Sequence, residues 1–300
     1  MKGLELSESY YNEYGKRMIE ESFFEYADRI AVGLVGEGSE CLGFDDDFSE
    51  DHDFEPGFCL FITEEDERKF GFKLERAYAR LPKEFMGYSR QKISPVGGAR
   101  HGVFTVKEFY RKILGYDGAP DSEEKWLFTP SHRLLSASNG KVFRDDLGEF
   151  SKIRETLKKG YPESVRRKKI ADSLLSMAQS GQYNYERCVK RGENGGAYFS
   201  LYEFIKNAVS LTYLLNNRYE PFYKWAFRGM RELPLLSELE AELFLLLSAE
   251  TDVSKKVKTV ELVAERVADE LRRQGLSNVG GNTLHAHAYS VMENGRRHKY

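Results

Sequence analysis

The sequence is poor in cysteine, tryptophan and proline, and it has no long apolar segment. Its three cysteines, Cys41, Cys59 and Cys188, stand far apart and outside any Cys-x-x-Cys spacing, so neither a zinc site nor a disulfide framework is indicated. No apolar run approaches the length of a membrane-spanning helix, and the first residues are polar and acidic, unlike a secretory signal. We therefore expect a cytoplasmic protein with no membrane partner.

The sequence also lacks an excess of either charge sign. Lysine and arginine number 45 against 48 acidic residues, for a formal net charge of -3. This balance gives no global attraction to nucleic acid, so a nucleic-acid partner is neither required nor excluded. With 300 residues, the chain is long enough to form two domains with proper cores.

Two aspartates stand one residue apart at the head of an apolar run that ends at Thr63. Alternate side chains of a strand share a face, so Asp51 and Asp53 are expected to project together. Neighbouring carboxylates repel each other, and a hard cation such as Mg²⁺ or Mn²⁺ between them relieves the repulsion and keeps positions open for phosphate oxygens. The pair therefore predicts a divalent metal site.

A glycine-rich step precedes the acidic pair. Gly36 and Gly38 allow the backbone to approach a ligand closely, and Ser39 adds a hydroxyl where backbone N–H groups can receive a phosphate. A phosphate loop followed by a metal site is typical of nucleotidyl transfer.

These motifs resemble a known signature. Gly38-Ser39, followed after residues 40–50 by Asp51-His52-Asp53-Phe54, is similar to the polymerase β-like nucleotidyltransferase superfamily. Three further segments resemble an uncharacterised bacterial branch, domain of unknown function 4037: G-K-V-F-R-D-D-L-G-E-F at 140–150, G-Q-Y-N-Y-E-R at 181–187 and L-N-N-R-Y-E-P-F-Y-K-W at 215–225.

The resemblance implies an α+β fold, with an N-terminal nucleotidyltransferase domain (a small mixed sheet flanked by helices) and a C-terminal helical bundle. It implies that Asp51 and Asp53 hold Mg²⁺, that Gly38 and Ser39 bind a nucleoside triphosphate, and that a nucleoside monophosphate is moved to an acceptor hydroxyl. The layout is similar to kanamycin-type nucleotidyltransferases, whose helical part shapes the acceptor site. The acceptor, a small molecule or a macromolecule, is not identified.

The sequence departs from the superfamily at the third strand. That strand usually carries a third carboxylate, whereas the segment His101–Thr105 contains no acidic residue. A base from elsewhere, weakened chemistry and a nucleotide-binding regulatory protein without turnover all stay open. Asp145, Asp146 and Glu149 are the nearest acidic candidates, but their position after Asn139-Gly140 favours turn and helix-capping roles.

Apolar periodicity sets the expected element order and a domain boundary near Gly160-Tyr161-Pro162, giving domains 1–160 and 161–300. We expect a helical segment at 4–31, strands at 31–35, 52–63 and 102–106, helices at 64–81 and 107–114, and only helices after about 163. Pro56-Gly57 predicts a bulge inside the second strand, and Asn139-Gly140 has the turn chemistry of a hairpin.

Basic residues of the helical half are ambiguous. Lys224, with Arg187 or Arg191, is expected to neutralise nucleotide phosphates across an interdomain cleft, while the alternative is an aromatic helix–helix corner around Lys224. The basic run 166–169 favours a solvated helix face, with a phosphate or nucleic-acid contact as the alternative. His285 and His287 are interpreted as exposed or packing residues. A toxin–antitoxin role ranks last, because the helical half, before its last few residues, contains no Arg followed at short range by His as in the associated ribonucleases.

Overall fold

The computed structural model describes residues 1–46, 55–90 and 100–297, and the chain forms two compact units. Unit 1 consists of Met1–Asp121 and Arg133–Lys159, and unit 2 consists of Ser122–His132 and Gly160–Tyr300. From Gly160 onward, the chain belongs to unit 2. The short segment Ser122–His132, which the sequence interpretation assigned to the N-terminal domain, belongs to unit 2.

Unit 1 combines short strands with helices on both of their faces. Its strands are β1 (Ala31–Leu34), β2 (Cys59–Ile62), β3 (Glu84–Phe85), β4 (Tyr88–Ser89), β5 (Gly102–Thr105) and β6 (Lys141–Arg144). Its helical elements are α1 (Gly3–Tyr10), η1 (Tyr11–Gly15), α2 (Lys16–Ser22), η2 (Phe24–Arg29), η3 (Glu40–Leu42), α3 (Glu64–Asp66), η5 (Glu67–Gly71), α4 (Phe72–Ala79), α5 (Val106–Leu114) and α8 (Glu149–Lys158).

Four of the strands form one mixed sheet in the order β5-β2-β1-β6, and β3 pairs with β4 separately. β1 runs antiparallel to both β2 and β6, whereas β2 and β5 are parallel. The register pairs Val32 with Leu60 and Leu60 with Val103. The expected small mixed sheet flanked by helices is confirmed, and so is the third strand near residue 102.

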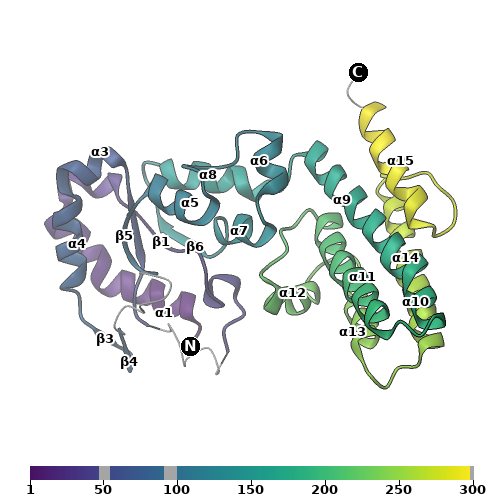
Figure 1. Ribbon diagram of the computed structural model, residues 1–300. Coiled ribbons are helices and arrows are strands. Elements are labelled where there is room, and N and C mark those ends of the chain that lie inside the picture. The colour runs from purple at the N-terminus through teal and green to yellow at the C-terminus, as the bar shows by residue number, and fades with distance from the viewer. Residues whose placement is uncertain (47–54, 91–99, 298–300) are drawn as a thin grey trace. The chain divides into compact units, whose positions relative to one another are not determined.

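Every residue of β1 and β2 is buried because helices cover both faces of the sheet. On one face, Val32 and Leu60 join a core with Ile19 of α2 and Leu74 of α4. On the other face, Phe61 stacks on Phe150 of α8, with ring centroids 4.0 Å apart. Figure 1 shows α4 on one side of the strands and α5 and α8 on the other.

The second strand begins later than the sequence predicts. Residues 55–58 are irregular, and β2 starts at Cys59 rather than at His52; residues 47–54 lie outside the described part of the chain. Side chains use the backbone groups just before the strand: Ser7 donates to the Gly57 carbonyl (2.6 Å), and the Phe58 N–H donates to the Tyr78 hydroxyl (3.1 Å). Pro56 and Gly57 therefore precede the strand instead of forming a bulge within it.

The prediction of a hairpin at Asn139-Gly140 is also wrong. The turn follows helix α7 (Ser131–Ser136), and β6 pairs with β1, which lies about a hundred residues earlier. Gly140 adopts a φ of 65°, so the turn chemistry is correct although its partner strand is not the sequence neighbour.

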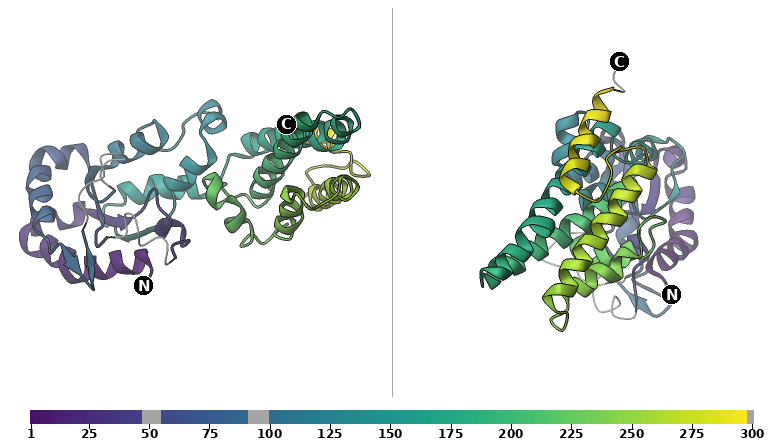
Figure 2. Two further views of the ribbon diagram at one scale, coloured as in Figure 1. Left: turned by 60° about the horizontal axis from the view of Figure 1, so that its bottom comes forward. Right: turned by 90° about the vertical axis from the view of Figure 1, so that its right-hand side faces the viewer.

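The regular elements of unit 2 are all helices within its described residues. Its elements are α6 (Glu123–Phe128), α9 (Glu163–Met177), η6 (Ala178–Tyr185), α10 (Glu186–Lys190), α11 (Asn194–Leu215), α12 (Tyr223–Met230), α13 (Leu239–Leu247), α14 (Val253–Arg273) and α15 (Leu284–Arg297), together with the start of α7. α9 lies against both α11 and α15, and α14 against α13 and α15 (Figure 2). Fully buried apolar residues such as Phe204 and Val263 fill the space between them. The expected helical bundle is confirmed.

Gly195 and Gly196 lie in the first turn of α11. His287 is fully buried and bonds to Ser277 Oγ (2.8 Å) and the Gly281 carbonyl (3.1 Å), so it is a packing residue. Among the described helices, none combines the length and the apolar character required to cross a bilayer.

Gly33 is expected to be essential for the pairing of β1 with β6. A Cβ at this position would lie 2.6 Å from the Lys141 carbonyl oxygen, a backbone atom that cannot retreat without loosening the sheet. Gly33→Ala should lower the free energy of unfolding by about 1–3 kcal/mol. The matched control is Gly118→Ala, whose Cβ would meet the Ile153 side chain at an ordinary 3.6 Å. Urea unfolding followed by circular dichroism tests this, and equal midpoints for the two variants would contradict it.

Candidate functional site

A glycine loop follows β1 and forms the centre of the candidate site. Gly36 and Gly38 have φ angles of 113° and 126°, a region in which a side chain is strained. Ser39 then begins the 3₁₀ turn η3, and its carbonyl accepts hydrogen bonds from the N–H groups of Leu42 and Phe44. The glycines are therefore required by the path of the chain.

The side chain of Asn139 fixes this loop from the neighbouring turn. Its Nδ2 donates to the Gly36 carbonyl (2.7 Å), and its Oδ1 accepts from the Gly36 N–H (3.0 Å). Gly36 is buried, so these two bonds satisfy backbone groups that would otherwise lack water. Next to them, the Gly140 N–H donates to the Cys41 carbonyl (2.9 Å). The loop is thus held at both of its ends.

Arg154 of α8 supports the turn that carries Asn139. Its guanidinium donates to the carbonyls of Asn139 and Gly140, the latter at 2.7 Å. The side chain is buried, and burial lowers the pKa of Arg154. A buried cation with carbonyl acceptors keeps its charge while it orders the backbone around it. Arg154 therefore acts on the loop through Asn139.

Arg100 lies against the other side of the loop. Its guanidinium donates to the Glu37 carbonyl (2.5 Å) and forms an ion pair with Glu40. A Cβ at Gly38 would overlap both the guanidinium and the Glu40 carboxylate, so only glycine permits this contact. The structure thus places a cation directly beside the predicted phosphate-binding step. Sequence reasoning missed Arg100 because it stands some sixty residues away from the loop.

Asp45 and Glu55, which flank the acidic pair in the sequence, each contact distant residues of unit 1. Asp45 is buried, accepts a hydrogen bond from the Gly3 N–H (2.7 Å) and lies 3.5 Å from the Lys2 ammonium. On the far side, Glu55 bonds to His101 Nδ1 (3.0 Å), and His101 packs against Gly57. These partners belong to α1 and to the start of β5. Sequence reasoning identified neither pair.

Asp51 and Asp53 themselves lie outside the described residues, and with them the expected metal site. Within residues 1–46, 55–90 and 100–297, no three His, Cys, Asp or Glu side chains are grouped to hold a metal ion. The donor set expected at 51 and 53, two carboxylates, has the hard oxygen chemistry that suits Mg²⁺. The placement of that set stays a prediction.

The acidic residues that follow the Asn139-Gly140 turn serve the structure. Asp145 accepts hydrogen bonds from the N–H groups of Gly148 (2.9 Å) and Ser151 (2.7 Å) at the start of α8, and Asp146 pairs with Arg144. The expected capping role of Asp145 is confirmed. β5 itself carries only Gly, Val, Phe and Thr, so the third carboxylate is absent from this strand.

The buried cysteines of unit 1 are not reactive thiols. Cys59 of β2 is buried, and burial raises its pKa to about 12; burial also raises the pKa of Cys41 well above its ordinary value. Cys59 Sγ donates to the Arg100 carbonyl (3.2 Å). Cys59 therefore serves as a small buried residue of the core.

The basic residues expected to meet phosphate belong to unit 2. Lys224 is exposed on α12, with its ammonium 5.3 Å from the ring centroid of Trp225. Arg187 of α10 lies 4.3 Å over the ring of Tyr183, and Arg191 follows at the end of the same helix. Lys224 and Arg187 thus lie over aromatic rings of their own unit, and their proposed contact with a nucleotide stays a prediction.

Asn139→Ala should release the glycine loop. The substitution leaves the buried N–H and C=O of Gly36 without partners, which costs about 1–3 kcal/mol for each unsatisfied group. Amide hydrogen exchange over residues 33–40 is expected to accelerate, whereas the exposed Asn12→Ala should leave it unchanged. Identical exchange in the two variants would show that Asn139 does not hold the loop.

Comparisons with known proteins give two similarities. Residues 126–226, about a third of the chain, match the model of the family described as Domain of unknown function (DUF4037). A solved structure of a nucleotidyltransferase-like protein from Exiguobacterium sibiricum 255-15 is similar at 12% identity and a TM-score of 0.39, covering 95% of this chain and 81% of that one. No curated protein matches. Neither similarity identifies a substrate or a reaction.

Proposed function

We propose that the chain is a metal-dependent nucleotidyltransferase, which moves a nucleoside monophosphate from a nucleoside triphosphate to an acceptor hydroxyl. The observation that supports this most is the glycine loop after β1, held by Asn139 and in contact with the guanidinium of Arg100. The loop stands in the sequence just before the Asp51-x-Asp53 motif, as in the resemblance stated above.

In this proposal the loop binds the triphosphate. Gly36 already uses its N–H and carbonyl on Asn139, so Gly38 and Ser39 are the residues assigned to the phosphates. Arg100 adds a positive charge beside Gly38, although it also forms an ion pair with Glu40. Asp51 and Asp53 would hold Mg²⁺ or Mn²⁺, which supplies charge neutralisation for the triphosphate when bound. Lys224, Arg187 of α10 and Arg191, which follows α10, remain proposed phosphate contacts.

The proposed reaction is a displacement at the α-phosphorus. The acceptor oxygen forms a bond to this phosphorus and loses its proton, and the bond to the β-phosphate oxygen breaks, so that pyrophosphate leaves. The chain's own part is to orient the triphosphate through a rigid loop and to offset the negative charge of the leaving group.

A second candidate function is nucleotide binding without turnover. It is favoured by β5, which carries no carboxylate, and by the engagement of Asp145 and Asp146 in capping and pairing. Such a protein would bind the metal–nucleotide complex through the same loop and use it as a signal. Release of pyrophosphate from the triphosphate in the presence of an acceptor distinguishes the two functions.

Asp51→Asn should strongly weaken Mg²⁺-dependent nucleotide binding and leave the fold intact, because it removes the charge of one proposed metal ligand and no apolar side chain. Calorimetric titration with MgATP is expected to show affinity reduced by about tenfold or more. The matched control is Asp46→Asn, which removes an exposed carboxylate nearby and outside the motif. Titration heats for Asp51→Asn equal to those of the wild type would contradict the assignment.

A further inference from the structure

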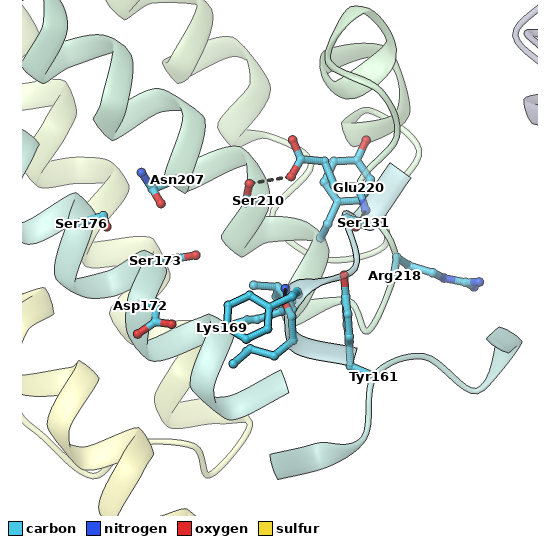
Figure 3. A pocket seen from close by; sticks show the side chains of 14 residues that line it. Ser131, Tyr161, Lys169, Asp172, Ser173, Ser176, Asn207, Ser210, Arg218 and Glu220 are labelled. Carbon is cyan, nitrogen blue, oxygen red and sulfur yellow. Dashed lines mark hydrogen bonds between the residues drawn. The ribbon is translucent and has the colours of Figure 1, made fainter. Parts of the chain in front are cut away.

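Unit 2 contains a pocket of about 380 Å³ between α9 and α11 that is lined by both polar and apolar residues (Figure 3). It is lined by Leu127, Phe128, Ser131, Tyr161, Lys169, Asp172, Ser173, Ser176, Asn207, Ser210, Tyr213, Leu214, Arg218 and Glu220. All of these residues belong to unit 2, and all of them fall within the segment 126–226 that matches the family model. The family-matched segment is therefore the part of the chain that forms this pocket.

Glu220 provides a negative charge in the pocket. Its backbone N–H donates to Ser131 Oγ (2.7 Å), and its carboxylate accepts a hydrogen bond from Ser210 (2.5 Å). Burial raises the pKa of Glu220, although the Ser210 bond and the charge of Lys206 oppose the rise. Within the described part of the chain, Glu220 has no ion-pair partner. Its carboxylate thus keeps acceptor capacity that the protein does not use.

Lys169 provides a positive charge in the same pocket. Its ammonium donates to the Leu127 carbonyl (2.7 Å) and lies 5.2 Å from the ring centroid of Tyr161. Burial lowers the pKa of Lys169, and the charge of Asp172 opposes this in part. No carboxylate of the described residues lies within ion-pair distance, so only one of three donors has a protein acceptor. Figure 3 shows Lys169 and Tyr161 below Glu220 and Ser210.

Lys169 ends the basic run that the sequence interpretation assigned to a solvated face. Arg166 and Arg167 both pair with Glu163 and have side chains only 13% and 14% exposed, and Lys168 pairs with Glu123. The run is therefore used mainly within unit 2. Lys169 differs from the other three basic residues because its side chain lines the pocket and has no ion-pair partner among the described residues.

Two further charges, Asp172 and Arg218, line the pocket from exposed positions, and the other polar lining groups are uncharged donors and acceptors. They include four serines and an amide: Ser131, Ser173, Ser176, Ser210 and Asn207. Burial raises the pKa of Tyr161 to about 12, so its phenol stays protonated at neutral pH. The apolar part of the lining includes Phe128, Tyr213 and Leu214. Such a lining suits a polar ligand with a small apolar part.

Lys169 and Glu220 are half-buried charges of opposite sign that have no ion-pair partner among the described residues, which is unfavourable unless a ligand supplies the opposite charges. A ligand with one charge would satisfy one of them and leave the other unmatched. We propose that the pocket binds a small zwitterion of amino-acid or dipeptide type, whose ammonium meets Glu220 and whose carboxylate meets Lys169. This site does not rest on the proposed nucleotidyl transfer.

The test is a thermal-shift screen of the full chain with the standard amino acids and their dipeptides with glycine, followed by calorimetric titration of the members that bind. At least one zwitterion is expected to raise the melting temperature. Its N-acetyl and amide derivatives, which each lack one charge, should bind about tenfold more weakly or worse. O-phosphoethanolamine is included because it replaces the carboxylate by a phosphate.

Lys169→Met and Glu220→Gln should each weaken binding of that zwitterion by about tenfold or more, whereas Lys168→Met, at the adjacent position outside the pocket lining, should not. MgATP titrations of the same variants should match the wild type, which separates this site from the glycine loop. The proposal is overturned if no zwitterion of the screen binds, if the capped derivatives bind equally well, or if O-phosphoethanolamine binds and the amino acids do not.

Discussion

The candidate nucleotide site of this protein depends on the paired hydrogen bonds between the Asn139 side chain and the backbone of Gly36. A loop that contains two glycines at positive φ has many accessible conformations in the unfolded chain, and it requires external contacts to adopt only one. Asn139 supplies those contacts because its amide offers a donor and an acceptor on one plane. Arg154 in turn holds the carbonyl of Asn139, so α8, the turn and the loop form one hydrogen-bonded unit.

The same principle explains why the sheet surrounds the loop as it does. β6 approaches β1 closely because Gly33 has no side chain, and this approach brings the turn at Asn139 next to Gly36. Parallel pairing of β5 with β2 brings the residues before β5, including Arg100, to the same region. The loop thus lies between the uncharged side chain of Asn139 and the ion pair of Arg100 with Glu40.

Much of this architecture follows from the sequence. Helical periodicity predicts the helix that begins at Glu64, and short apolar runs predict β1 and the strand at Gly102, because these signals are local in the sequence. The start of β2 and the partner of β6 are not predicted, because both depend on residues that are distant in the sequence. Ser7 and Tyr78 bond to the backbone of Gly57 and Phe58 just before β2, and β6 pairs with β1. For the site, glycine spacing identifies Gly38 and Ser39, whereas Arg100, Asn139 and Glu55 act across separations that no motif records. The sequence also did not predict that Lys169 and Glu220 line a pocket, since Lys169 cannot be distinguished in the sequence from the other members of the basic run 166–169.

Hydrogen exchange of the full chain with and without MgATP tests the central claim most directly. If the glycine loop receives the triphosphate, the nucleotide should slow exchange at residues 36–40 and around Arg100, while peptides of α11 and α14 in unit 2 keep their rates. Protection that appears only in unit 2, or no protection at saturating nucleotide, would contradict the account.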